Sequence, residues 1–188
     1  MSNSPGSVSF RYGAEADFFA KLAENFKATL NTKDAEDFEN GGLDLVRREI
    51  NLLQNQQQVT KNLQNMTRVQ RFLDRMNDLQ TVLETLGFPA VDSVMACIWG
   101  PMRFFLKVAH VLDRAFDNVL DVYHRFGLCI LPYNDYVTFF GVSQNSIRCL
   151  IHTYDDVLEF HSAAYSVFSL RVGRTLPAKP LPSAALQI

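Results

Sequence analysis

The stretch IWGPMRFFLKVAHVLDRAFDNVLDVYHRFG, residues 98–127, decides the fold of this 188-residue chain. Its apolar residues recur at intervals of three, four and seven, which is the spacing of one helix face. Gly100 and Pro101 precede this pattern, and proline lacks a backbone N–H and disfavours a helical conformation in the residue before it. The pattern predicts a break at Gly100–Pro101 and a long central amphipathic helix over residues 102–126, which Gly127 closes.

The rest of the chain carries the same periodicity, and no run alternates as a β-strand would. Gly87 closes one helix, and Ser143 caps the last long one. The expected helices cover residues 14–30, 34–38, 43–65, 66–86, 91–99, 102–126, a short segment ending at residue 140, and 143–171. We therefore predict an all-α fold, a bundle of about five to seven helices.

The domain boundaries follow from composition. Residues 1–13 are rich in Ser, Gly and Pro and are predicted to be disordered, residues 14–171 form the helical bundle, and residues 172–188 form a flexible proline-rich tail. The predicted core combines aromatic and aliphatic residues from several helices: Phe72, Leu79, Trp99, Phe105, Leu112, Phe116, Val119, Tyr123, Ile151, Tyr154, Leu158 and Phe168.

Bulk properties exclude several classes of protein. The net charge of −2 argues against a general nucleic-acid binder. The three cysteines, Cys97, Cys129 and Cys149, have no metal-binding spacing and are interpreted as buried, reduced thiols. No signal peptide is visible, and no apolar run reaches the roughly 20 residues that a membrane helix needs. These features predict a cytoplasmic protein.

A search for catalytic patterns finds no GxSxG elbow, dinucleotide fingerprint or P-loop. His110 and His124 lie about 21 Å apart along the predicted central helix, too far to share a site. Asp155, Asp156, Glu159 and His161 offer metal-ligating groups, but His161 is only two residues from Glu159 and points elsewhere, and no metal motif occurs. The acidic residues are interpreted as a solvated face. We therefore predict no enzymatic activity, no cofactor and no metal.

One charged surface is a candidate binding site. Arg68, Arg71 and Arg75 recur at intervals of three and four and share the polar side of the helix predicted over residues 66–86. They are a candidate docking surface for an acidic protein partner or an anionic lipid. The alternative interpretation is a solvated helix face.

Four stretches together resemble a known family: RVQRFLDRMNDLQTVLE (68–84), IWGPMRFFLKVA (98–109), AFDNVLDVYHRFGLCILPYNDYVTFF (115–140) and IHTYDDVLEFHSAAYSVF (151–168). Their order and spacing resemble the helical domain of unknown function at the N-terminus of fungal NACHT/STAND proteins, which are NLR-like signalling ATPases. The resemblance covers residues 15–171, and its motifs are hydrophobic and structural. The 188 residues themselves contain no NACHT module and no repeat array.

The resemblance implies a function rather than a chemistry. In such proteins the N-terminal domain is thought to act as an adaptor or effector that contacts a protein partner or itself, while the NACHT module senses and oligomerises. The alternative is a membrane-active, pore-forming helical effector, which would require the helix over residues 14–30 to insert into a bilayer. Lys21, Glu24 and Lys27 make such insertion costly, so membrane binding is not favoured.

Overall fold

A computed structural model describes residues 13–60, 66–109, 113–130 and 143–173. In these ranges the chain forms seven helices and no strand, which confirms the predicted all-α bundle. The helices are α1 (Gly13–Lys27), α2 (Thr32–Glu39), α3 (Leu43–Thr60), α4 (Thr67–Thr85), α5 (Val91–Val108), α6 (Asp113–Cys129) and α8 (Gln144–Arg171). None of these helices is long and apolar enough to cross a membrane.

Some predictions fall on other parts of the chain. Residues 1–12, the short helix expected to end at residue 140, and residues 174–188 lie outside the described ranges. The last two described residues, Val172 and Gly173, belong to the end of α8. Val172 is half-buried against the core, so the compact part of the chain extends slightly beyond the predicted boundary.

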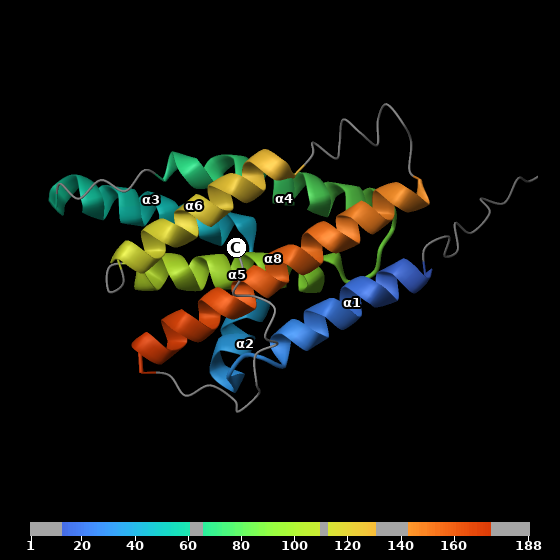
Figure 1. Ribbon diagram of the computed structural model, residues 1–188, viewed down its shortest axis with the longest axis horizontal. Coiled ribbons are helices and arrows are strands. Elements are labelled where there is room, and N and C mark those ends of the chain that lie inside the picture. Colours follow the sequence, from blue (N-terminus) through green and yellow to red (C-terminus); the bar gives the residue numbers. More distant parts are fainter. Residues whose placement is uncertain (1–12, 61–65, 110–112, 131–142, 174–188) are drawn as a thin grey trace, which may run out of the picture.

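The bundle is arranged around α5. This helix packs against α1, α2, α3, α4 and α8, while α6 packs chiefly against α4. Figure 1 shows α6 and α8 in front of α5, with α1 alongside α8 and α2 at one end of the bundle. The element that organises the bundle is therefore the helix that contains Trp99, Gly100 and Pro101.

The predicted long helix over residues 102–126 is wrong in its boundaries. α5 runs without a break through Gly100 and Pro101 to Val108, and α6 begins at Asp113 and continues through Gly127 to Cys129. The residue before a proline normally avoids the helical conformation because its Cβ meets the proline ring. Glycine has no Cβ, which removes part of that clash.

Two other predicted helix ends, at Ser143 and Gly87, are confirmed. The side chain of Ser143 accepts the backbone N–H three residues further on, at 3.1 Å, and caps α8. Gly87 follows α4 with a φ of +71°, the left-handed conformation that glycine adopts readily. α2 begins after Asn31, whose side chain accepts the N–H of Asp34 at 2.9 Å.

The predicted core is largely confirmed. The buried members are Phe72, Leu79, Trp99, Phe105, Phe116, Val119, Tyr123, Tyr154, Leu158 and Phe168. Ile151 is half-buried and packs against the same cluster, and Leu112 lies outside the described residues. The core is rich in aromatic contacts, and the rings of Phe105 and Phe168, for example, lie 5.2 Å apart at their centroids.

Two glycines allow helices to approach closely. A Cβ placed on Gly100 would lie 2.5 Å from the Cβ of Phe38, where α2 crosses α5. A Cβ placed on Gly127 would lie 2.8 Å from the backbone nitrogen of Phe72, where α6 meets α4. Both crossings depend on the missing side chain, which explains glycine inside two helices despite its poor helix propensity.

We expect Gly100→Ala to lower the free energy of unfolding by about 1–3 kcal/mol, as other overpacking substitutions do. The new methyl group must displace Phe38 or separate α2 from α5. Gly42→Ala is the matched control, because nothing lies within 4 Å of a Cβ at that position. Urea denaturation measures both, and equal stability of the two variants would contradict the close packing of α2 on α5.

Candidate functional site

α5 contains a carbonyl group that the helix cannot pair by itself. Pro101 has no backbone N–H, so the carbonyl oxygen of Cys97, four residues earlier, lacks its usual intrahelical donor. A buried acceptor left unpaired costs about 1–3 kcal/mol. His161 of α8 supplies a donor, because its Nδ1 lies 3.2 Å from the Cys97 oxygen. This bond joins α8 to α5 beside the proline.

The other ring nitrogen of His161 joins a third helix. Nε2 lies 2.9 Å from the hydroxyl of Tyr123 in α6. A carbonyl can only accept, so Nδ1 carries the proton, and Nε2 accepts the hydrogen bond that the Tyr123 hydroxyl donates. We name the Cys97 carbonyl, His161 and Tyr123 the histidine network. It connects α5, α8 and α6 at the centre of the bundle.

Burial controls the protonation of the histidine network. It lowers the pKa of His161 to about 3, against the smaller raising effect of the hydrogen bond to the Cys97 carbonyl. Burial also raises the pKa of Tyr123 well above its ordinary value. The imidazole is therefore neutral and the phenol protonated at neutral pH. His161 is 0% exposed and Tyr123 2% exposed, so this pair is placed to hold helices together rather than to meet a substrate.

His161 points away from Glu159, as its position two residues further along the helix predicts, and it lies in the core, a location that the sequence did not predict. The two aspartates and Glu159 do lie at the surface or half-buried. In the part of the chain that the structure describes, no group of three candidate ligands could hold a metal ion.

A second buried polar cluster holds α8 one turn beyond His161, at Tyr165. The carboxylate of Asp34, 1% exposed, accepts hydrogen bonds from the Tyr165 hydroxyl and the Asn31 side-chain amide, both at 2.7 Å. Because Asn31 also caps α2, the beginning of α2 is tied to α8. This cluster stabilises an inter-helix contact, and neither it nor the histidine network was predicted from the sequence.

The structure does not present the three predicted docking arginines as one free basic surface. Arg68 pairs with Asp117 and, at 2.6 Å, with Asp121 of α6. The hydrogen bond to Asp117 is the main cause that raises the pKa of Arg68. Arg75 lies 3.6 Å from Asp78, and its Nε is buried without a hydrogen-bond partner. Arg71 alone of the three is exposed.

The predicted burial of the cysteines is correct only for Cys97. Burial raises the pKa of its thiol to about 11, so it stays protonated. Cys129 and Cys149 are free thiols and exposed. His124 and His152 are also exposed, and His110 lies outside the described residues.

An open hollow of about 420 Å³ lies where the loop between α2 and α3 meets α4 and α5. Trp99 is at its base, with its indole nitrogen 3.4 Å from the Gln80 side-chain oxygen. Glu39, Asp44 and Asp92 also line it. Its charged groups do not converge on a nucleophile or on a base with a shifted pKa, so the hollow has no recognisable catalytic arrangement.

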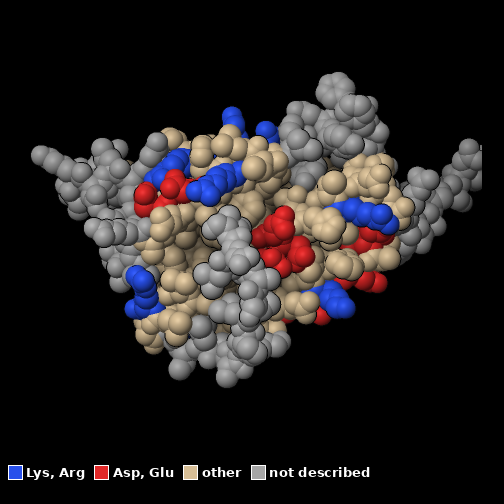
Figure 2. Space-filling model, in the orientation of Figure 1, with Lys and Arg blue, Asp and Glu red and all other residues tan. Residues whose placement is uncertain are grey.

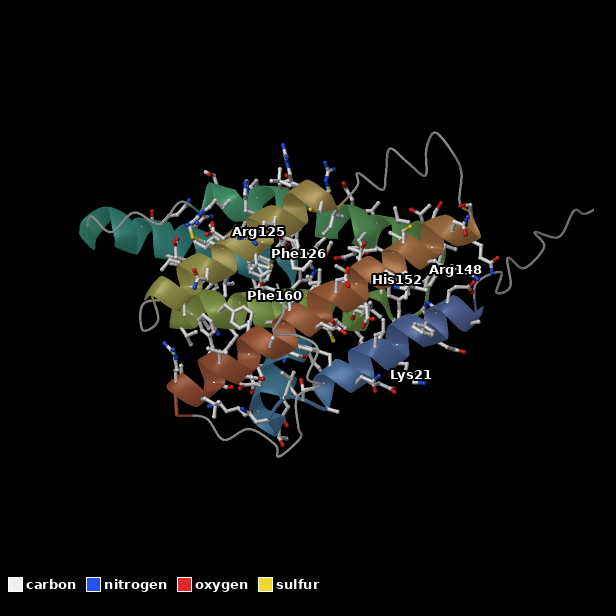
Figure 3. The ribbon with its side chains drawn as sticks, viewed as in Figure 1. Lys21, Arg125, Phe126, Arg148, His152 and Phe160 are labelled. Carbon is white, nitrogen blue, oxygen red and sulfur yellow. The ribbon has the colours of Figure 1, made fainter. Side chains whose placement is uncertain are left out.

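The outer face of α8 offers a different kind of site. Val167 and Leu170 are 47% and 64% exposed, and Phe160 and Ala163 continue the same line at helical spacing. We name these four residues the α8 stripe. The ring of Phe160 lies 5.8 Å from that of Phe126 in α6, and Figure 3 shows these two side chains between the helices. The stripe therefore continues toward α6.

The two halves of α8 differ in chemistry on this side. Arg148 and His152, labelled in Figure 3, are exposed in the N-terminal half, and Asp156 follows them one turn later. The stripe begins at Phe160, after these charged groups. Figure 2 shows acidic side chains over the middle of α8. After Phe160, the exposed residues of α8 are Val167, Leu170 and, at its end, Arg171. This change makes the C-terminal half the candidate interaction surface.

No family model, curated protein or solved structure matches this chain. The resemblance seen in the sequence therefore stays a prediction.

We expect His161→Phe to lower the free energy of unfolding by about 2–4 kcal/mol, because it leaves the Cys97 carbonyl and the Tyr123 hydroxyl without partners. In a Pro101→Ala background the restored backbone N–H pairs the Cys97 carbonyl. In that background, His161→Phe should lower the free energy of unfolding by about 1–2 kcal/mol less than it does in the wild-type chain. A double-mutant cycle in urea measures this coupling, and additive costs would contradict the link between the proline and the histidine.

The histidine network also predicts a dependence of stability on pH. The pKa of His161 is about 3 in the folded chain against its ordinary 6.5, so between these values the unfolded chain binds one proton more. Stability should fall as pH falls through this window, by up to about 1.4 kcal/mol per pH unit from this group. Urea unfolding from pH 7 to 4 should give a flatter profile for His161→Gln. Parallel profiles would refute the assignment.

Proposed function

We propose that this chain is a helical protein-interaction domain without enzymatic activity, an adaptor or effector of a fungal NLR-like (STAND) signalling system. The observation that carries the proposal is the exposed part of the α8 stripe, Val167 and Leu170, on the side of α8 away from the core. The resemblance of residues 15–171 to the N-terminal domains of NACHT proteins supplies the biological setting.

α8 exposes apolar side chains besides those that it buries. Its core face holds Leu158, Tyr165 and Phe168, so the exposed Val167 and Leu170 are additional to what the fold needs. Contiguous apolar surface that stays exposed is typical of sites for protein association. A helix face with anchors at intervals of three and four is a common recognition element. The occupant we propose is a protein partner or a second copy of the chain.

Other parts of the proposal follow from the sequence. The net charge of −2 argues against nucleic acid as a partner. The proposed setting is the cytoplasm, with a NACHT-type module in full-length relatives. The proposal that the domain is not an enzyme is supported by the histidine network, since its most perturbed group, His161, is fully buried.

The membrane-active alternative has less support. It requires α1 to leave the bundle, but Phe19 and Phe26 of α1 are 1% and 3% exposed and belong to the core. Lys21 and Glu24 are charged and exposed on the same helix. Release of α1 would expose the aromatic core to water before any contact with a bilayer offset the lost burial. Vesicle leakage on addition of the oligomerised chain would favour this alternative, and absence of leakage would remove it.

The surface can be tested with Val167→Glu combined with Leu170→Glu. Both side chains are exposed, so the free energy of unfolding should change by less than about 1 kcal/mol. Leu52→Glu on α3 is the matched control, because Leu52 is 51% exposed and lies away from the stripe. Proximity labelling reports protein partners, and sedimentation reports self-association. We expect the wild-type chain and the Leu52→Glu control to give the same result in both measurements. The double variant should lose the partner or the self-association. Unchanged association of the double variant would refute the proposed surface.

A further inference from the structure

Along the outer side of α8, an acidic residue, an apolar segment and a basic residue follow one another. Asp156 precedes the α8 stripe, Arg171 follows it at the end of the helix, and both side chains are exposed. The positions from Asp156 through the stripe to Leu170 are spaced 4, 3, 4 and 3 residues apart, which keeps them on one side of a helix. Within the described residues, neither Asp156 nor Arg171 forms an ion pair.

The order of these charges selects the orientation in which a second copy of α8 fits this surface. If two α8 helices lay parallel, each Asp156 would face the same aspartate of the other copy, and each Arg171 would face the same arginine. If they lie antiparallel, each Asp156 faces Arg171 of the other copy. Opposite charges stabilise such a contact, whereas like charges in contact destabilise it. The surface is therefore complementary to itself in the antiparallel, two-fold symmetric arrangement.

The two ion pairs also determine the register. Asp156 and Arg171 lie about 22 Å apart along the helix, and the midpoint between them lies beside Ala163. Phe160 of one copy then faces Val167 of the other, and Ala163 lies next to the two-fold axis. The distance between packed helices depends on the side chains at the contact, so this small residue allows the helices to approach closely. The register that pairs the charges is thus also the one that pairs the apolar residues.

Another antiparallel register fits the surface less well. The N-terminal half of α8 exposes Arg148 and His152, and these cations could face Asp156 of a second copy if the N-terminal halves overlapped. That register would leave Val167 and Leu170 exposed to water. Burial of apolar surface is the main favourable contribution to most protein association, so the register centred on Ala163 is favoured.

We propose that this chain forms a two-fold symmetric dimer in which the α8 stripes of two copies pack antiparallel, with Asp156 of each copy paired to Arg171 of the other. The inference rests on the proposed function, because it names a second copy as the occupant of the same surface. A contact limited to one helix pair buries less than the roughly 1,200–2,000 Å² of stable interfaces. The dimer is therefore weak and forms where copies of the chain are held close together.

The first experiment measures the dissociation constant of the full-length chain by sedimentation equilibrium up to millimolar concentration. Asp156→Arg and Arg171→Asp should each weaken the dimer about tenfold, because each replaces two attractive pairs by two repulsive ones. Combining the two substitutions should restore the wild-type constant. Glu24→Arg on α1 and Arg47→Asp on α3 are the matched controls, since both side chains are exposed on other helices. A chain that stays monomeric would overturn the proposal, and failure of the combined variant to restore association would overturn the register.

The second experiment tests the register by disulfide formation in a Cys129→Ser, Cys149→Ser background, which removes the two exposed thiols. Across the two-fold axis, the Ala163 positions are adjacent, whereas the Val167 positions lie about 10 Å apart along the helices. A disulfide requires Cα atoms about 4.4–6.8 Å apart. With copper phenanthroline as oxidant, Ala163→Cys should give a covalent dimer and Val167→Cys should not. Equal cross-linking of the two variants, as a parallel pair would give, would overturn the antiparallel arrangement.

The dimer and the proposed function can fail separately, because sedimentation of the purified chain involves no other protein. A monomeric chain whose labelled partners are lost on combining Val167→Glu with Leu170→Glu would overturn the dimer and leave the protein-interaction function in place. A dimer that this double variant leaves intact would overturn the α8 stripe as the surface of both.

Discussion

The hydrogen bond from His161 to the Cys97 carbonyl is the interaction on which the rest of the bundle depends. Pro101 lies inside the central helix and leaves that carbonyl without an intrahelical donor. α5 can remain continuous and central because His161 of α8 supplies the missing hydrogen-bond donor. Tyr123 then satisfies the second nitrogen of the same ring. One imidazole thus sets the relative positions of α5, α6 and α8.

The two buried polar clusters give the bundle its specificity. An apolar helix face tolerates several packing arrangements, whereas a buried hydrogen bond is satisfied in few of them. His161 determines how α8 sits on α5, and Asp34 with Tyr165 determines how the beginning of α2 meets α8. The glycine at position 100 then lets α2 lie directly on α5. With α8 held from within, its outer surface is free to serve another purpose.

The functional proposal follows from that division of α8. Its inner face holds the structure together through aromatic packing and two polar anchors. Its outer face changes from charged residues to the apolar stripe between Asp156 and Phe160. Phe160 of the stripe packs against α6, whereas Val167 and Leu170 stay exposed and contribute little to the fold. Surface of this kind is typical of recognition rather than catalysis, which supports the proposed protein-interaction domain.

The sequence by itself determined the helical class, most of the core, and helix ends such as Ser143, because these depend on local spacing and capping. It could not determine that Pro101 would lie within a helix, since the compensating donor comes from residue 161. It could not determine the hydrogen bonds of His161 or the ion pairs of Arg68, because their partners, the Cys97 carbonyl and the acidic residues of α6, are distant in the chain. Only the tertiary structure brings those partners together, and only it decides which apolar residues remain for binding.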